Sequence, residues 1–204
     1  IVNLKGATVI PGLIDSHVHS TGASVYEYDH AVPTMHEIAD VLSYIKQRAE
    51  LLEDDQWISL SQVFITRLKE QRFPTRDEMD SVAPNNPVMF RTGPDTAVNS
   101  RALELSGIDD TFKAPEGANY KLERDADGKL TGVLRSGRSL LKYESNTKSP
   151  SQEERISQVK KLIHDYNSVG ITSVSDRNAG DGAVDIWRTL YETQTLNVRV
   201  FLYY

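Results

Sequence analysis

Hydrophobic positions with helical spacing alternate along the 204-residue chain with short apolar runs typical of strands. Between residues 38 and 52, apolar side chains recur every three or four positions, which predicts an amphipathic helix. The preceding Thr34-x-x-Glu37 is a capping box and predicts where this helix begins. Two more capping boxes, Thr75-x-x-Glu78 and Ser151-x-x-Glu154, predict the starts of two later helices.

The apolar runs predict the strands. They are rich in β-branched and aromatic residues and are bounded by turn signals. The predicted strands cover residues 13–19, 56–60, 88–91, 171–176 and 196–204, with a hairpin over 120–133 and short helices over 100–105 and 181–193. From residue 151 onward, helix, strand, helix and strand follow one another with short links, which predicts the βα repeat of a parallel sheet.

A pair of histidines two residues apart stands at the end of the first predicted strand. Because alternate residues of a strand point to the same face at a rise of about 3.3 Å each, His17 and His19 are predicted to converge on one ion. Neutral imidazole is the commonest metal ligand in proteins, and two buried rings without partners would be costly. The alternative is a pair of core histidines that are satisfied by ordinary hydrogen bonds.

The composition of the chain argues against several classes of binding partner. The net charge is −6 with scattered Lys and Arg, which argues against a nucleic-acid groove or a membrane-binding face. No apolar run approaches a length of about 18 residues, which a membrane-spanning helix would need. The chain has no cysteine, so disulfides and thiolate metal sites are excluded.

Several separated motifs resemble one protein family. The Pro11-Gly12 break followed by His17-x-His19 resembles the first barrel strand of the amidohydrolase superfamily. The segments that resemble its amidohydrolase 3 branch, the YtcJ-like proteins, are 72–76, 83–88, 98–108, 131–135 and 170–174. This resemblance implies an incomplete (β/α)8 TIM-barrel-like α/β fold, in which His17 and His19 bind a divalent metal, expected to be zinc.

The same resemblance implies a domain organisation. Residues 1–10 are expected to connect from a small β-sandwich, and residues 11–204 to form the first part of the hydrolase barrel with a long α+β insertion at about 34–150. The chain begins with Ile1 and ends in the apolar run 196–204, so we expect it to be a segment of a longer protein. Further metal ligands and the general base are then expected outside the chain, and the segment alone is predicted to be inactive.

Two aspartates are candidate substrate contacts. Where the family has a histidine thought to face the substrate, this chain has Pro94, and Asp95 is the nearest polar replacement. Asp176 ends the predicted strand 171–176, at the strand end where barrels present functional side chains. A loop-bonding or helix-capping role for Asp176 is equally open.

The expected activity is hydrolysis of a non-peptide C–N bond, of the amide, cyclic amide or urea type, in a small molecule. A divalent ion would activate the attacking water. The alternative is a non-catalytic homologue that binds a ligand or partner, which is favoured by the loss of the family histidine at Pro94.

Overall fold

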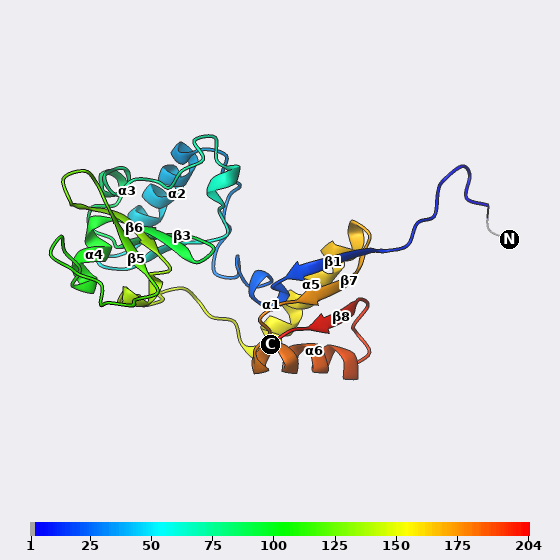
Figure 1. The fold of residues 1–204 in the computed structure, drawn as a ribbon. Coiled ribbons are helices and arrows are strands. Elements are labelled where there is room, and N and C mark those ends of the chain that lie inside the picture. The colour runs from blue at the N-terminus through cyan, green and yellow to red at the C-terminus, as the bar shows by residue number, and fades with distance from the viewer. Residues whose placement is uncertain (1–2) are drawn as a thin grey trace. The chain divides into compact units, whose positions relative to one another are not determined.

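The computed structural model describes residues 3–204, which form two compact units. One, the discontinuous unit, combines the described part of Ile1–Val32 with Thr147–Tyr204. The other, the continuous unit, is Pro33–Asn146. The chain therefore leaves the discontinuous unit once and returns to it after the continuous unit is complete (Figure 1).

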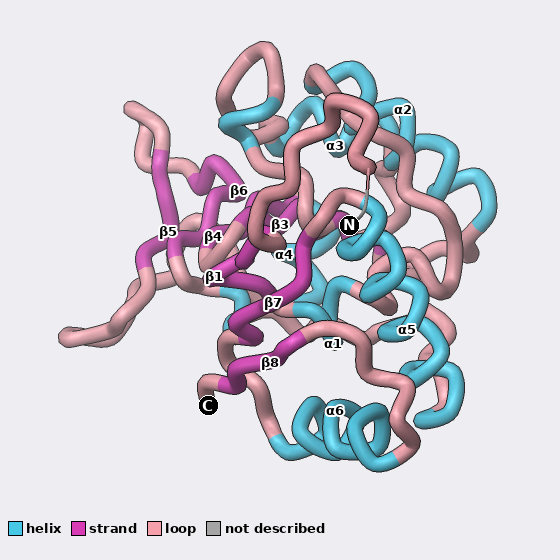
Figure 2. The backbone as a smooth tube through the Cα atoms, turned by 90° about the vertical axis from the view of Figure 1, so that its right-hand side faces the viewer, coloured by secondary structure: helices cyan, strands magenta, loops and turns pink. Residues whose placement is uncertain are grey.

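The discontinuous unit is built on a parallel sheet of three strands in the order β1-β7-β8. Its elements are β1 (Leu13–Val18), α1 (Ser20–Ala23), α5 (Gln152–Ser168), β7 (Ile171–Asp176), α6 (Asp181–Glu192) and β8 (Arg199–Leu202). Helices α5 and α6 lie along the same side of β7 and β8 (Figure 2). Their apolar stripes, together with Val198 directly before β8, make the core of this unit, which comprises Val159, Ile163, Ile186, Trp187, Leu190 and Val198.

The continuous unit contains a mixed sheet in the order β2-β3-β4-β6-β5, in which only the β2–β3 pair is parallel. Its strands are β2 (Ile58–Leu60), β3 (Val88–Thr92), β4 (Asp95–Val98), β5 (Lys121–Arg124) and β6 (Leu130–Arg135). Its helices are α2 (Ile38–Leu51), α3 (Arg76–Val82) and α4 (Ser100–Ser106), with short 3₁₀ turns at Ile65–Arg67 and Arg138–Leu140.

Strands β3 and β4 form a tight hairpin whose two loop residues are Gly93 and Pro94. Gly93 has a φ of +58°, and proline fixes its own φ near about −65°. This sign pattern is that of a type II′ turn, which suits the twist of antiparallel strands. Pro94 therefore has a structural role in this chain, at the position where the family resemblance places a histidine.

The observed helices begin where the capping boxes in the sequence predict, with one exception. The capping boxes at Thr75 and Ser151 are confirmed, since each hydroxyl accepts the backbone N–H three residues on. The predicted cap at Thr34 is wrong. Helix α2 instead begins after Glu37, whose capping box is completed by Asp40. The capping boxes that begin at Thr34 and at Glu37 overlap in the sequence. The carboxylate of Asp40 stabilises the one at Glu37 by accepting the N–H groups of His36 and Glu37.

The mixed α/β class predicted from the sequence is confirmed by these sheets and helices. Placement of the discontinuous unit in a (β/α)8 barrel, with residues 34–150 as an insertion, stays a prediction. Residues 3–10 contain no helix or strand, and the start of the predicted sandwich connection, residues 1–2, lies outside the described residues. Within residues 3–204, none of the helices combines the length and the apolar character needed to cross a bilayer.

Candidate metal centre

The histidine pair lies where β1 ends and α1 begins. His17 is the penultimate residue of β1, and His19 is the N-cap residue of α1. Both side chains are exposed, whereas Val18 and Ser20 are buried. The alternation of exposed and buried side chains expected of a strand therefore continues through this turn. It leaves the two imidazoles on the solvent-exposed side.

The two rings are close enough to share an ion. Their centroids are 5.2 Å apart, and their planes are almost perpendicular at 84°. Two imidazoles that bind one tetrahedral zinc at about 2.0–2.1 Å from each nitrogen have centroids about 5 Å apart. The separation of His17 and His19 is therefore compatible with joint ligation.

The ring of His19 has a defined hydrogen-bond partner. Its Nδ1 lies 2.7 Å from the backbone carbonyl oxygen of Arg177. A carbonyl oxygen only accepts, so Nδ1 is the nitrogen that carries the proton. In the neutral ring, Nε2 then keeps its lone pair, which is the arrangement found in most metal-binding histidines. The donor chemistry of His19 therefore fits a divalent ion.

Arg177 also holds the backbone around the histidines. Its N–H donates to the carbonyl oxygen of Val18 at 2.8 Å, and its Nε donates to that of Ser16 at 3.2 Å. Its guanidinium carbon lies 3.8 Å from the centroid of the Tyr203 ring, within cation–π distance. The segment after β7 thus fixes both sides of the turn that contains His17 and His19.

Asp176 lies beside this turn and is 1% exposed. Its Oδ1 accepts the backbone N–H of Ser20 at 3.1 Å, and its Oδ2 accepts the indole N–H of Trp187 at 2.9 Å. The structure therefore brings together His17, His19 and Asp176 in one unit. The substrate contact predicted for Asp176 stays a prediction.

Asp95 belongs to the continuous unit, where it takes part in a network of charged groups. Its Oδ2 accepts from the guanidinium of Arg135 at 2.7 Å, and its Oδ1 accepts the N–H of Ser136 at 3.1 Å. Arg135 also bonds Glu123 at 2.6 Å and lies over the ring of Phe73. These contacts join β4 to β6. The substrate contact predicted for Asp95 stays a prediction as well.

A tyrosine on α5 faces the same region of the discontinuous unit. Burial raises the pKa of Tyr166, and the negative charges of Asp15 and Asp176 add to this effect. Its hydroxyl is therefore neutral at physiological pH.

The described part of the chain does not contain a complete set of metal ligands. Among residues 3–204, no group of three or more histidine, cysteine, aspartate or glutamate side chains is placed to hold a metal ion. Since a catalytic zinc usually has three protein ligands, the predicted pair His17 and His19 would be only part of such a set.

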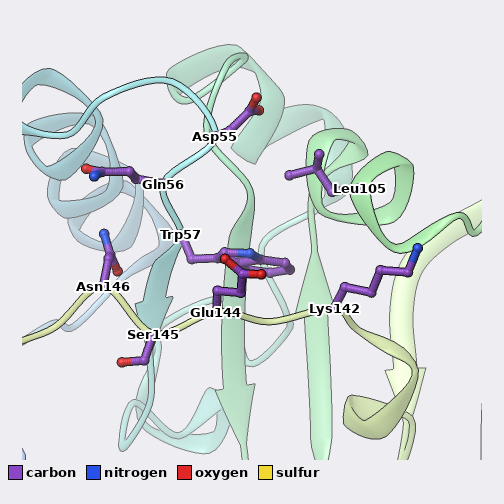
Figure 3. A pocket seen from close by; sticks show the side chains of 8 residues that line it. All are labelled: Asp55, Gln56, Trp57, Leu105, Lys142, Glu144, Ser145 and Asn146. Carbon is purple, nitrogen blue, oxygen red and sulfur yellow. The ribbon is translucent and has the colours of Figure 1, made fainter.

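A surface pocket of about 410 Å³ lies in the continuous unit (Figure 3). Lys142 and Leu105 stand on one side of Trp57, and Gln56 and Asn146 stand on the other. The remaining lining residues are Asp55, Glu144 and Ser145. None of the predicted site residues lines this pocket.

Comparison with known proteins decides the family. Residues 1–202 match the family described as the amidohydrolase family. The chain belongs to the amidohydrolase family. Membership predicted from the strand-end histidines and the later motifs is thereby confirmed.

Two named relatives and one solved structure are similar to the chain. The amidohydrolase chain is 31% identical over 195 residues to the N-substituted formamide deformylase of Arthrobacter pascens, covering 92% of this chain and 36% of that protein. It is 27% identical over 135 residues to YtcJ of Bacillus subtilis, covering 65% and 25%. An uncharacterised metal-dependent hydrolase from Pyrococcus horikoshii aligns with 95% of this chain and 36% of its own, at 18% identity and a TM-score of 0.46.

Sequence reasoning missed two contributors to the site of this amidohydrolase chain, Arg177 and Trp187. Arg177 directly follows Asp176, so its place after a strand end was the only local signal. Trp187 appeared as one apolar residue among several on a helix, and nothing in the pattern indicated that its indole N–H bonds a carboxylate.

Proposed function

We propose that this protein is a metal-dependent hydrolase in which His17 and His19 hold a divalent ion, zinc, through their free ring nitrogens. The observation that carries the proposal is the 2.7 Å contact between Nδ1 of His19 and the carbonyl oxygen of Arg177, next to a second imidazole 5.2 Å away. A ligating histidine typically donates its other N–H to such an oxygen.

When bound, zinc lowers the pKa of a coordinated water towards about 7 and polarises a carbonyl group. The residues of this chain perform the supporting tasks. The carbonyl oxygen of Arg177 keeps the proton of His19 on Nδ1. Arg177 and Asp176 hold the turn rigid by bonding Val18 and Ser20. A fixed turn reduces the entropy lost when the two imidazoles converge on an ion.

The proposed substrate is a small molecule with a non-peptide C–N bond, of the amide, cyclic amide or urea type. Family membership supports a hydrolase, and the name of the Arthrobacter relative describes an enzyme acting on N-substituted formamides. The chain spans 36% of the length of that relative, so the activity of the whole protein is a proposal. Since the described residues place only two metal ligands, we propose that these 204 residues alone do not catalyse turnover.

The test uses the intact gene product, stripped of metal and then loaded with zinc. Hydrolysis is measured on an N-substituted formamide, a cyclic amide and a urea, with an ester as comparison. We expect zinc-dependent cleavage of at least one C–N substrate, lost in His19→Asn and retained in His36→Asn, where an exposed histidine of the continuous unit is changed. Zinc-dependent turnover that survives the double variant His17→Asn/His19→Asn would contradict the proposal. Absence of both metal binding and turnover would favour a ligand-binding homologue without catalysis.

A further inference from the structure

The buried carboxylate of Asp176 makes contacts that point to a role other than substrate binding. We infer that Asp176, held by Trp187, is a positioning residue that fixes the His17–His19 turn for metal binding. This inference rests on the proposed function, because it concerns the same metal pair. It gives Asp176 a different task from the direct substrate contact predicted from the sequence.

The first step is the set of hydrogen bonds between the end of β7 and the turn that contains His17 and His19, called the histidine turn. The segment Asp176–Arg177 bonds three consecutive residues of that turn. Arg177 N–H donates to Val18, the carbonyl oxygen of Arg177 accepts from His19, and Asp176 Oδ1 accepts from Ser20. His19 is therefore fixed at its ring and at the backbone on both sides.

The second step is the way the carboxylate itself is held. Asp176 is the register partner of Val18 on β1 and of Leu202 on β8, so it sits on the central strand of the sheet. Its own carbonyl oxygen accepts the N–H of Tyr203 at 2.9 Å. The indole of Trp187, 3% exposed in the core of α5 and α6, then orients the second carboxylate oxygen. The turn is thus tied through Asp176 to the packed core of the unit.

The third step is the chemical requirement for a carboxylate. Both oxygens of Asp176 accept from N–H donors, one from the backbone and one from an indole. An asparagine could accept only one of these bonds, since its amide group would face the other donor with N–H. Replacement by asparagine should therefore release either the turn or Trp187, while the size of the side chain stays almost the same.

The experiment compares three variants of the intact gene product. Asp176→Asn and Trp187→Phe each remove one part of the proposed support. Asp185→Asn makes the same chemical change on the exposed face of α6, where the carboxylate bonds only Arg188 among the contacts described, and serves as the matched control. Zinc affinity is measured by calorimetry. The tautomer of His19 in the metal-free protein is read from ¹⁵N NMR of its ring, and circular dichroism with thermal melting checks folding.

We expect Asp176→Asn to weaken zinc binding by about 10- to 100-fold, the usual cost of losing outer support for a ligating histidine. The same variant should mix the tautomers of His19. Trp187→Phe should produce the same changes to a smaller extent, and it provides the test if Asp176→Asn fails to fold. Asp185→Asn should match the wild type in both measurements.

Outcomes separate the inference from the proposed function. If the wild type binds zinc through its histidines and folded Asp176→Asn or Trp187→Phe retains full affinity and a single His19 tautomer, the positioning role is overturned. A raised KM for the C–N substrate, together with unchanged zinc affinity in Asp176→Asn, would also overturn the positioning role. This result would favour a direct substrate contact. If the wild type binds no zinc, the proposed function fails, yet a mixed His19 tautomer in Asp176→Asn still supports a fixed turn.

Discussion

The side-chain Oδ1 of Asn99 accepts a hydrogen bond from the backbone N–H of Val88, the first residue of β3, 2.9 Å away. The same oxygen caps α4 by accepting the N–H of Ala102. Its amide nitrogen donates to the carbonyl oxygens of Ala83 and Asn86. One completely buried amide therefore joins the end of α3, the start of β3 and the start of α4.

Asn99→Asp should destabilise the continuous unit strongly. Aspartate cannot donate, so two buried carbonyl oxygens would lose their partner and face a carboxylate. We expect a loss of about 3 kcal/mol or more in the free energy of unfolding, measured by urea denaturation at neutral pH. Asn146→Asp, at an exposed position, is the control and should change stability by less than about 0.5 kcal/mol. Equal effects in the two variants would refute the bridging role.

Gly132→Ala should be more costly than Gly128→Ala. Both glycines have positive φ, +88° and +79°, which costs other residues about 1–2 kcal/mol. A Cβ at Gly128 meets no atom within 4 Å, whereas one at Gly132 overlaps the carbonyl oxygen of Val98 on the neighbouring strand. Overpacking adds about 1–3 kcal/mol to the loss at Gly132. Thermal denaturation of both variants measures the difference, and equal melting temperatures would rule out a steric role for Gly132.

Acid should weaken the contact between Arg72 and Glu78. The bidentate guanidinium of Arg72 lowers the pKa of Glu78 from 4.5 to about 2, with help from the N–H of Thr75. Because the folded pKa lies below the unfolded one, the contribution to stability is complete above about pH 4.5 and disappears as pH falls towards about 2. Glu78→Gln should therefore be less stable at pH 7 and should lose less stability over this interval.

The matching variant Arg72→Gln tests the cause of that behaviour. It removes the guanidinium and should flatten the same part of the stability curve, measured by urea denaturation at several pH values. The double variant should show much less than the sum of the two single losses, since both remove one interaction. Additive losses would mean that Glu78 does not owe its low pKa to Arg72.

Zinc should raise the melting temperature through the histidine pair. A ligand that binds only the folded state at 100 times its Kd adds about 2.7 kcal/mol to the free energy of unfolding. We expect a rise in the wild type and in His36→Asn, and none in His17→Asn/His19→Asn, in thermal shift measurements with added zinc. A chelator should reverse the rise. An equal rise in the double variant would show that zinc binds elsewhere.

Much of the local structure could be predicted because its signals are local. The hairpin of β5 and β6 followed from Asp127-Gly128, and Gly128 does adopt a positive φ. Strand β4 was missed, since it is only four residues long and only its last two, Ala97 and Val98, are apolar. The Gly93-Pro94 turn directly before β4 is the one local signal for this strand in the sequence.

The candidate site was predictable only in part for a similar reason. The spacing of His17 and His19 is visible within three residues. The groups that support them are distant in sequence, since Arg177 lies 158 residues from His19 and Asp176 lies 156 residues from Ser20. Such pairs arise from the parallel register of β1 with β7, which the hydrophobic pattern of either strand does not specify.

The pairing of β1 with β7 also has a consequence for the order of folding. Leu13 pairs with Ile171, and the whole continuous unit lies between them in the sequence. During synthesis, the ribosome therefore releases the mixed sheet before the partner of β1 exists. Closing so long a loop makes this pairing slow. The histidine turn should accordingly acquire its final shape late in folding, and a nascent chain stalled before β7 should carry imidazoles that are not yet aligned.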